Sequence, residues 1–309
     1  MKSTHIRLED LLVIGDESAV LREVEHIASM TVPSLEPGRL RAVFGDIMAL
    51  YSGACRGYAK CDAEYHDLGH TLGVFIAMAR LMHGACSAGV NISGEAVFLG
   101  LVSSLFHDVG YLRADGENHG TGAQFTSTHV ARSIRLMQAY FTQHGFTEED
   151  FIFCRKLLYC TDLSLKTGEI AFSSTEERLL GHMLGTADIL GQTAERAYLE
   201  KLLLLYREFR EGNIGDYESE LALLESTPGF FYLMQHRLEH DLGNVQAYLG
   251  PHFRIRWRID RDLYTDAART NLNFLNTILS DYRHDYRSRL QRDGIVQRLQ
   301  ENTAADGCQ

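Results

Sequence analysis

The chain has 309 residues, of which 45% are hydrophobic and 23% are charged, and its formal net charge is −11. This length and composition are typical of a globular protein with a sizeable buried core. A net negative charge repels nucleic-acid phosphates, so we expect no broad nucleic-acid interface and no nucleic-acid partner.

The N-terminal stretch MKSTHIRLEDLL is too polar for a secretory signal. No apolar run approaches the roughly 20 residues needed to cross a bilayer. The six cysteines are scattered and never form C-x-x-C. This usage is typical of a reduced, intracellular protein without a disulfide frame. We therefore expect a cytoplasmic protein without a membrane partner.

The apolar residues recur mostly at three- and four-residue spacing, and only four prolines occur, so the sequence predicts an all-α fold. Capping boxes are expected at Thr147 with Asp150 and at Ser174 with Glu177. The predicted helices are, in chain order, 18–30, 38–51, 63–83, 94–107, 124–144, 148–159, 175–191, 194–211, 217–224, 230–248 and 263–300, with a break in the last left open.

Glycine and proline mark the expected loops at 166–168, 212–215, 228–229 and 250–251. One stretch, HFRIRWRID at 252–260, departs from the helical period. Its apolar residues alternate with histidine and arginine, which predicts a short edge strand.

The first stretch that suggests chemistry is EYHDLGHT, in which His66 and His70 are four residues apart. If this segment is helical, both imidazoles lie on one face and reach the same point. A histidine pair alone is more often solvated or hydrogen-bonded, so it needs support from elsewhere in the chain.

That support comes from two later stretches. In FLGLVSSLFHDVGYL, His107 and Asp108 follow a nearly all-apolar helix, where a carboxylate is costly unless a cation pairs with it. In GHMLGTADILGQ, Asp188 lies among small residues that let another helix approach closely. Two imidazoles and two carboxylates (His70, His107, Asp108, Asp188) suit a divalent ion, and Asp108 is the natural bridge to a second one.

The order of these motifs resembles the H…HD…D signature of the HD-domain metal-dependent phosphohydrolases. It is most similar to the cyclic-nucleotide phosphodiesterase branch, whose first motif Y-H-N-x-x-H matches residues 65–70 except at Asp67. The resemblance covers residues 58–209 and comprises three separate motifs in the same order.

The resemblance implies an HD-domain helical bundle with a C-terminal helical extension. One domain over 1–309 would have a core at about 58–210, with the helices of 1–57 and 211–309 packed on it. It also implies one or two divalent ions (Mn, Mg, Fe or Zn) and hydrolysis by a metal-bound hydroxide. The substrate would be a small phosphorylated molecule such as a phosphodiester, a nucleotide or a cyclic nucleotide. The oligomeric state stays open, a homodimer included.

By the same resemblance, His70, His107, Asp108 and Asp188 bind the first ion, and His66 is the general acid that protonates the leaving oxygen. Asp67 is expected to face solvent. The chain lacks the further histidine that the phosphodiesterases carry after HD, and their E-N-H-H motif is reduced to STHVA at 127–131. There, His129 is a candidate for substrate contact or for the second ion.

Other polar residues have simpler expected roles. A second HD pair, His240 and Asp241, belongs to a polar helix, so solvent exposure is expected. His119 is a loop histidine that could approach a second ion but is more often solvated. Three arginines could hold a phosphate, but we expect them to lie at the surface as most arginines do: Arg113, Arg132 and Arg135.

Two alternatives to the phosphohydrolase remain. Some HD-fold proteins use a di-iron centre for oxygen-dependent cleavage, for which His119 and His129 could supply ligands. The other alternative is a non-catalytic regulatory module that keeps the metal, although such a module has little use for His66.

Overall fold

The computed structural model describes residues 6–306, and the side chains of residues 6–301. Its α-helices are α1 (Glu17–Thr31), α2 (Pro37–Ser52), α3 (Leu68–Ser87), α4 (Gly94–Phe106), α5 (His129–Gln143), α6 (Glu148–Leu158), α7 (Thr175–Thr193), α8 (Tyr198–Glu211), α9 (Glu220–His236), α10 (Leu249–Trp257), α11 (Leu263–Asp281), α12 (Tyr286–Arg289) and α13 (Ile295–Asp306).

Single helical turns join several of these helices, among them η2 (Val109–Tyr111), η3 (Gly122–Phe125), η5 (Arg237–Asp241) and η6 (Val245–Tyr248). Residues 6–306 contain no β-strand, and the one isolated β-bridge joins Tyr58 to Ala114. The all-α prediction is therefore confirmed.

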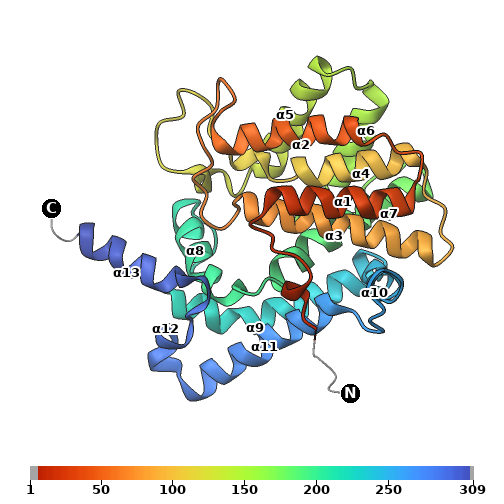
Figure 1. Ribbon diagram of the computed structural model, residues 1–309. Helices are drawn as coiled ribbons and strands as arrows, with labels where there is room; N and C mark the ends of the chain where they lie inside the picture. The colour runs from red at the N-terminus through yellow and green to blue at the C-terminus, as the bar shows by residue number, and fades with distance from the viewer. Residues whose placement is uncertain (1–5, 307–309) are drawn as a thin grey trace.

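Helix α3 is the centre of the molecule, because it packs against α1, α4, α7 and α10 (Figure 1). Every residue from His70 to Ala85 except Gly73 is buried. Such an apolar helix has no solvent face, which is why its neighbours surround it. The first residues of α3 carry polar side chains into this buried region.

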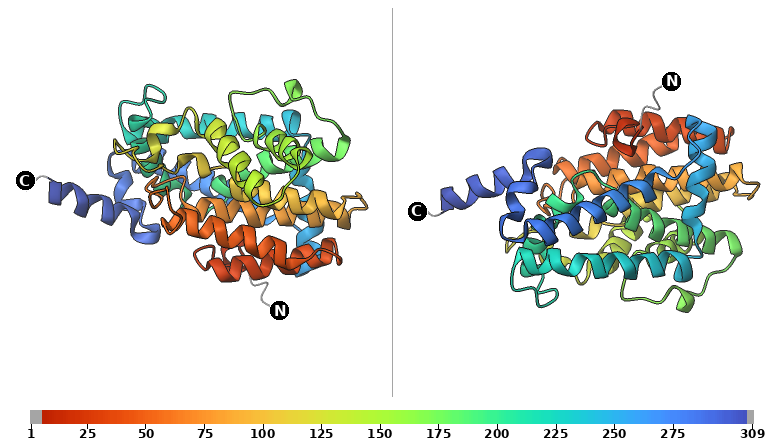
Figure 2. Two further views of the ribbon diagram at one scale, coloured as in Figure 1. Left: turned by 90° about the horizontal axis from the view of Figure 1, so that it is seen from above. Right: turned by 90° about the horizontal axis from the view of Figure 1, so that it is seen from below.

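The C-terminal helices build a second hydrophobic cluster beside the main one. Side chains of α8, α9, α11 and α13 form it, with Leu203, Leu224 and Leu275 among its fully buried members. The leucine run at 202–205 belongs to this cluster. In Figure 2, α13 extends away from the rest of the bundle.

The stretch at 252–260 is not a strand, contrary to the prediction. Most of it belongs to α10, in which Leu249, His252 and Phe253 are buried against the interior at helical spacing. The alternating pattern was misleading because the buried stripe begins at Leu249, before the alternation starts. Gly250 and Pro251 lie in the first turn of α10 rather than in a loop, and a proline is tolerated there.

Three further predicted boundaries are wrong. Helix α9 continues through Pro228 and Gly229, where a loop was expected, because Leu224 and Met234 are buried on both sides of the proline and packing outweighs propensity. The expected helix at 230–248 is instead the end of α9, followed by η5 and η6. The predicted helix at 63–83 begins only at Leu68.

The capping predictions are close to what the structure shows. Thr147 and Asp150 form a reciprocal capping box at the start of α6. The Ser174 hydroxyl accepts from the Glu177 amide at the start of α7, but the Glu177 carboxylate accepts from the Ser173 amide instead of closing the box.

The five cysteines within residues 6–306 are all free thiols, and Cys308 lies outside the described residues. Within the described part of the chain, no helix combines the length and the apolar character that crossing a bilayer requires.

Candidate metal centre

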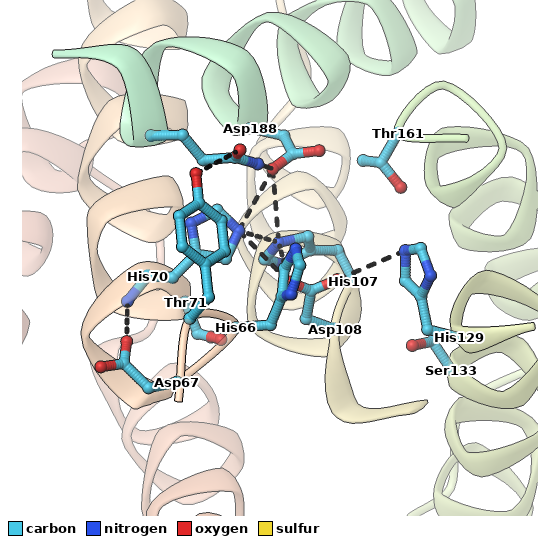
Figure 3. A network of polar contacts seen from close by, with 12 residues as sticks. His66, Asp67, His70, Thr71, His107, Asp108, His129, Ser133, Thr161 and Asp188 are labelled. Carbon is cyan, nitrogen blue, oxygen red and sulfur yellow. Dashed lines mark hydrogen bonds and ion pairs between the residues drawn. The ribbon is translucent and has the colours of Figure 1, made fainter. Parts of the chain in front are cut away.

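Four side chains from three helices point toward one another in the interior (Figure 3). His70 lies in the first turn of α3, His107 is the C-cap of α4, and Asp108 follows it directly. Asp188 projects from α7, which packs against both α3 and α4. The structure thus brings together all four residues that the sequence proposes as ligands of the first ion.

The donor atoms of this cluster are close to one another. The Nε2 atom of His70 lies 3.1 Å from Nε2 of His107, 3.2 Å from Oδ2 of Asp108 and 3.2 Å from Oδ1 of Asp188. The Nε2 atom of His107 lies 3.3 Å and 3.8 Å from the same two oxygens. Ligands at about 2.1 Å from an ion are about 3.0 to 3.4 Å apart, so this spacing fits a shared cation.

The burial of these groups also favours a cation. His70, His107 and Asp108 are at most 3% exposed, and Oδ2 of Asp108 has no hydrogen-bond partner. A buried carboxylate oxygen without a partner is costly unless a positive charge faces it. His70, His107 and Asp108 therefore form a group that could hold a metal ion.

His107 is oriented as metal-binding histidines usually are. Its Nδ1 atom lies 2.9 Å from the Ser104 carbonyl oxygen, which accepts the Nδ1 proton. A neutral imidazole held in this way presents a bare Nε2 atom to the cluster. The last turn of α4 therefore sets the direction in which this ligand points.

The electrostatics of the cluster call for positive charge at its centre. Burial alone would lower the pKa of His70, but the adjacent carboxylates of Asp108 and Asp188 raise it to about 10. Burial alone would raise the pKa of Asp108, but the imidazoles of His107 and His70 hold it well below its usual range. A divalent ion between these groups supplies the same positive charge as protons on the imidazoles.

His66 lies beside the cluster without belonging to it. Its ring centroid is 5.8 Å from that of His70 and 4.3 Å from that of Tyr111, on which it stacks. The residue precedes α3, so the prediction that His66 and His70 share a helical face is wrong. Asp67 between them is the N-cap of α3, and its carboxylate accepts from the His70 amide at 2.9 Å.

The expectation that Asp67 faces solvent is only partly correct. Its side chain is 39% exposed, and Oδ1 lies 3.4 Å from the Lys201 ammonium. The N-cap ends the loop and starts the helix at this point, which separates the two histidines into different local structures.

Glu208 holds His66 in place and was not identified from the sequence. Its Oε2 atom lies 2.6 Å from Nδ1 of His66, and its Oε1 atom accepts from the amides of Tyr65 and His66 at 2.7 Å and 3.3 Å. The pKa of Glu208, which burial would raise, is lowered by His66 and by these amides. Its only sequence signal is an acidic residue within the leucine-rich helix α8.

His129, the first residue of α5, lies next to the cluster on the Oδ1 side of Asp108. Its Nδ1 atom is 2.7 Å from the Thr126 carbonyl oxygen, which leaves Nε2 facing Oδ1 of Asp108 at 3.7 Å. Burial lowers the pKa of His129. Oδ2 of Asp108 thus faces the imidazole nitrogens of His70 and His107, and Oδ1 faces that of His129.

Gln192 connects Asp188 to Tyr65. Its amide nitrogen donates to Oδ1 of Asp188 at 2.8 Å, and its oxygen accepts from the Tyr65 hydroxyl at 3.0 Å. These bonds restrict the rotation of the Asp188 carboxylate, as partners of metal ligands commonly do.

None of the other candidates lies among the donor atoms of the cluster. His119, His240 and Asp241 are exposed, as expected. Arg113 is paired with Asp62, and Arg132 with Glu117. Arg135 is exposed on α5.

Comparisons of this chain with family models, with curated proteins and with solved structures found no match. The chemistry of the site therefore follows from its own donors and their surroundings.

Proposed function

We propose that the chain is a metal-dependent phosphohydrolase that cleaves a phosphodiester or a nucleotide. One observation carries the proposal: a buried cluster of two imidazoles and two carboxylates lies beside a histidine that is not one of its donors and that has its own carboxylate. The order of the motifs, which resembles the HD-domain phosphohydrolases, supports the same reaction class.

The metal would be held by His70, His107, Asp108 and Asp188, and the donor set suits Mn²⁺, Mg²⁺, Fe²⁺ or Zn²⁺. His129 and the second oxygen of Asp108 would hold a second ion, because these two acceptor atoms lie 3.7 Å apart, which is close enough to share one cation. When bound, such ions polarise phosphoryl oxygens and lower the pKa of water.

His66 would act as the general acid. Glu208 occupies its Nδ1 atom, so Nε2 is the nitrogen left to give a proton to the leaving oxygen. A carboxylate on Nδ1 also stabilises the imidazolium before the proton is transferred, as in other carboxylate–histidine pairs. The stacked rings of Tyr111 and His129 keep the imidazole from turning away.

A purified preparation tests this function by metal analysis and by hydrolysis of bis(p-nitrophenyl) phosphate and a panel of nucleotides. Asp108→Ala and His107→Ala are expected to lose most of the bound metal and the activity, because removing a ligand weakens a preformed site steeply. The chain offers a matched control in its second HD pair, so His240→Ala and Asp241→Ala should keep both.

Full metal content and a normal rate in Asp108→Ala would overturn the assigned site. Product formation that requires oxygen would contradict hydrolysis and favour the di-iron alternative. Bound metal without turnover of any phosphorylated compound would favour the regulatory module.

A further inference from the structure

None of the four cluster residues lines a second feature of the fold, a cavity of about 770 Å³. Its walls are the N-terminal segment at 7–15, one stripe of α3, the junction of α7 and α8, and α13. The α3 stripe consists of Gly69, Gly73, Ile76 and Arg80, which lie on one face at helical spacing. A volume of this size is typical of a small-molecule site.

Arg80 is a buried cation without an anionic partner. The residue is 2% exposed, and one terminal nitrogen, Nη1, donates to the Tyr264 hydroxyl at 2.9 Å. Its Nε and Nη2 atoms are buried and have no hydrogen-bond partner. None of the ion pairs among the side chains of residues 6–301 includes Arg80.

The two free nitrogens are the pair that binds a carboxylate edge-on. Elsewhere in this chain the same atoms of Arg41 hold both oxygens of Glu25, and those of Arg256 hold both oxygens of Glu23. Arginine stays charged in proteins and presents Nε–H and Nη2–H as a fork suited to carboxylates and phosphates. In Arg80 this fork has no acceptor from the chain.

Most of the other charged residues of the cavity are already paired, and Arg298 donates to the Asp293 carbonyl oxygen at 2.7 Å. Lys201 lies between Asp67 and Glu195, at 3.4 Å and 3.1 Å from their oxygens. Arg196 pairs with Asp293, and Arg7 with Glu9. The acidic residues of these walls therefore have partners of their own.

Apolar side chains cover much of the remaining wall, among them Leu8, Leu12, Ile14 and Ile295. Val13 borders the cavity and is 70% exposed. A ligand of matching chemistry has one anionic group and an apolar body.

We propose that this cavity binds a small organic anion, with a carboxylate or phosphate group on Arg80 and an apolar body along the N-terminal segment and α13. Arg80 borders the cavity, but its Nε and Nη2 atoms are covered in this structure. The side chain must therefore turn toward the cavity for an anion to reach the fork. The site contains none of the four cluster residues, and the inference does not depend on the proposed hydrolysis.

Calorimetric titration of the metal-free chain, kept in chelator, tests the proposal. The probes are octanoate and octyl phosphate, with octylamine and acetate as controls for charge and for the apolar body. We expect one octanoate or octyl phosphate to bind per chain. The affinity for octylamine and for acetate should be weaker by at least about tenfold. The two anionic probes distinguish a carboxylate site from a phosphate site.

Two variants locate the binding. Arg80→Met removes the charge at similar volume and should lower the affinity by about tenfold or more. Gly73→Leu fills the cavity and should abolish binding, and its Cβ has room because the nearest atom, the Gly191 carbonyl oxygen, is 3.8 Å away. Arg254 is 61% exposed and lies outside the cavity, so Arg254→Met should bind the anionic probes as the wild type does.

Several results would overturn the proposal. One is that neither anionic probe binds, and another is that octylamine binds as tightly as octanoate. A third is unchanged affinity in Gly73→Leu, which stays informative even where Arg80→Met does not fold. Unchanged affinity in a folded Arg80→Met would show that the apolar chain binds without the cation.

Discussion

Glu208 limits what His66 can do. A histidine in a loop would rotate freely, but this one is tied at Nδ1 to a buried carboxylate and stacked on Tyr111. The partners are 142 residues apart in the chain, so no local motif could reveal the pair. His107 and Asp108 could be proposed because they follow an apolar run, where a polar side chain needs an explanation. Asp188 was proposed from its small neighbours, and His70 from its spacing to His66 and from the resemblance.

His66→Asn should separate metal binding from acid catalysis. Metal content is expected to stay near that of the wild type, because the Nε2 atom of His70 and not His66 faces the other donors. Hydrolysis of a substrate with a poor leaving group should fall by about two to four powers of ten. A nitrophenyl phosphodiester needs little protonation and should lose much less.

Metal content and both rates, measured on one preparation, decide between the outcomes. Equal losses on the two substrates at full metal content would contradict the general-acid role. Loss of metal in His66→Asn would mean that His66 is itself a ligand.

Glu208→Gln should destabilise the fold in a pH-dependent way. The pKa of Glu208 is lower in the folded chain than its usual value of 4.5. A carboxyl of this kind stabilises the folded state above about pH 4.5, and the contribution is lost as the pH falls through the folded pKa. Urea unfolding should therefore show a loss of about 2 kcal/mol at pH 7 that shrinks in acid.

Glu225 provides the control, since its pair with Arg283 is largely exposed. Glu225→Gln should change the free energy of unfolding by less than about 0.5 kcal/mol. A difference between Glu208→Gln and wild type that is the same at pH 4 and pH 7 would disprove the linkage.

At the scale of elements, the contact between η2 and α5 positions His129 beside the cluster. The Gly110 amide, two residues after Asp108, donates to the Ser133 hydroxyl at 2.8 Å. A Cβ at Gly110 would lie 2.0 Å from the His129 carbonyl oxygen, so the two backbones touch. The glycine after the HD pair therefore lets α5 bring His129 to Asp108.

Gly110→Ala should push α5 away and lower the free energy of unfolding by about 1–3 kcal/mol. Gly45 is the matched control, because it lies inside α2 and a Cβ there meets nothing within 4 Å. Gly45→Ala should leave stability unchanged or raise it by about 0.5–1 kcal/mol. Thermal and urea unfolding of both variants would measure this, and equal stability would refute the close contact.

The helices themselves were largely predictable, because their apolar residues recur at helical spacing. Boundaries were missed where packing outweighs local propensity, as at Pro228 inside α9. The start of α3 was missed because Asp67, a good N-cap, was interpreted as a surface residue within a longer helix. At 252–260, a few alternating residues predicted a strand, because the buried helical stripe begins earlier in the chain, at Leu249.

For the whole molecule, metal binding should appear as global stability. The cluster joins α3, α4 and α7, so an ion that binds only the folded chain stabilises all three together. At a hundredfold excess over its dissociation constant, the gain is about 2.7 kcal/mol. Thermal unfolding with Mn²⁺ and with chelator should show this gain in wild type and not in Asp108→Ala, and an equal gain in both would contradict the site.

The burial of α3 on all sides has a consequence for hydrogen exchange. Amides in the middle of a helix that is covered by α1, α4, α7 and α10 cannot reach water through local fraying. They exchange only when the whole domain opens, so their protection reports the global free energy of unfolding. Because His70 belongs to the same helix, an ion in the cluster should slow the exchange of amides as far away as those near Ala85, about four turns along α3.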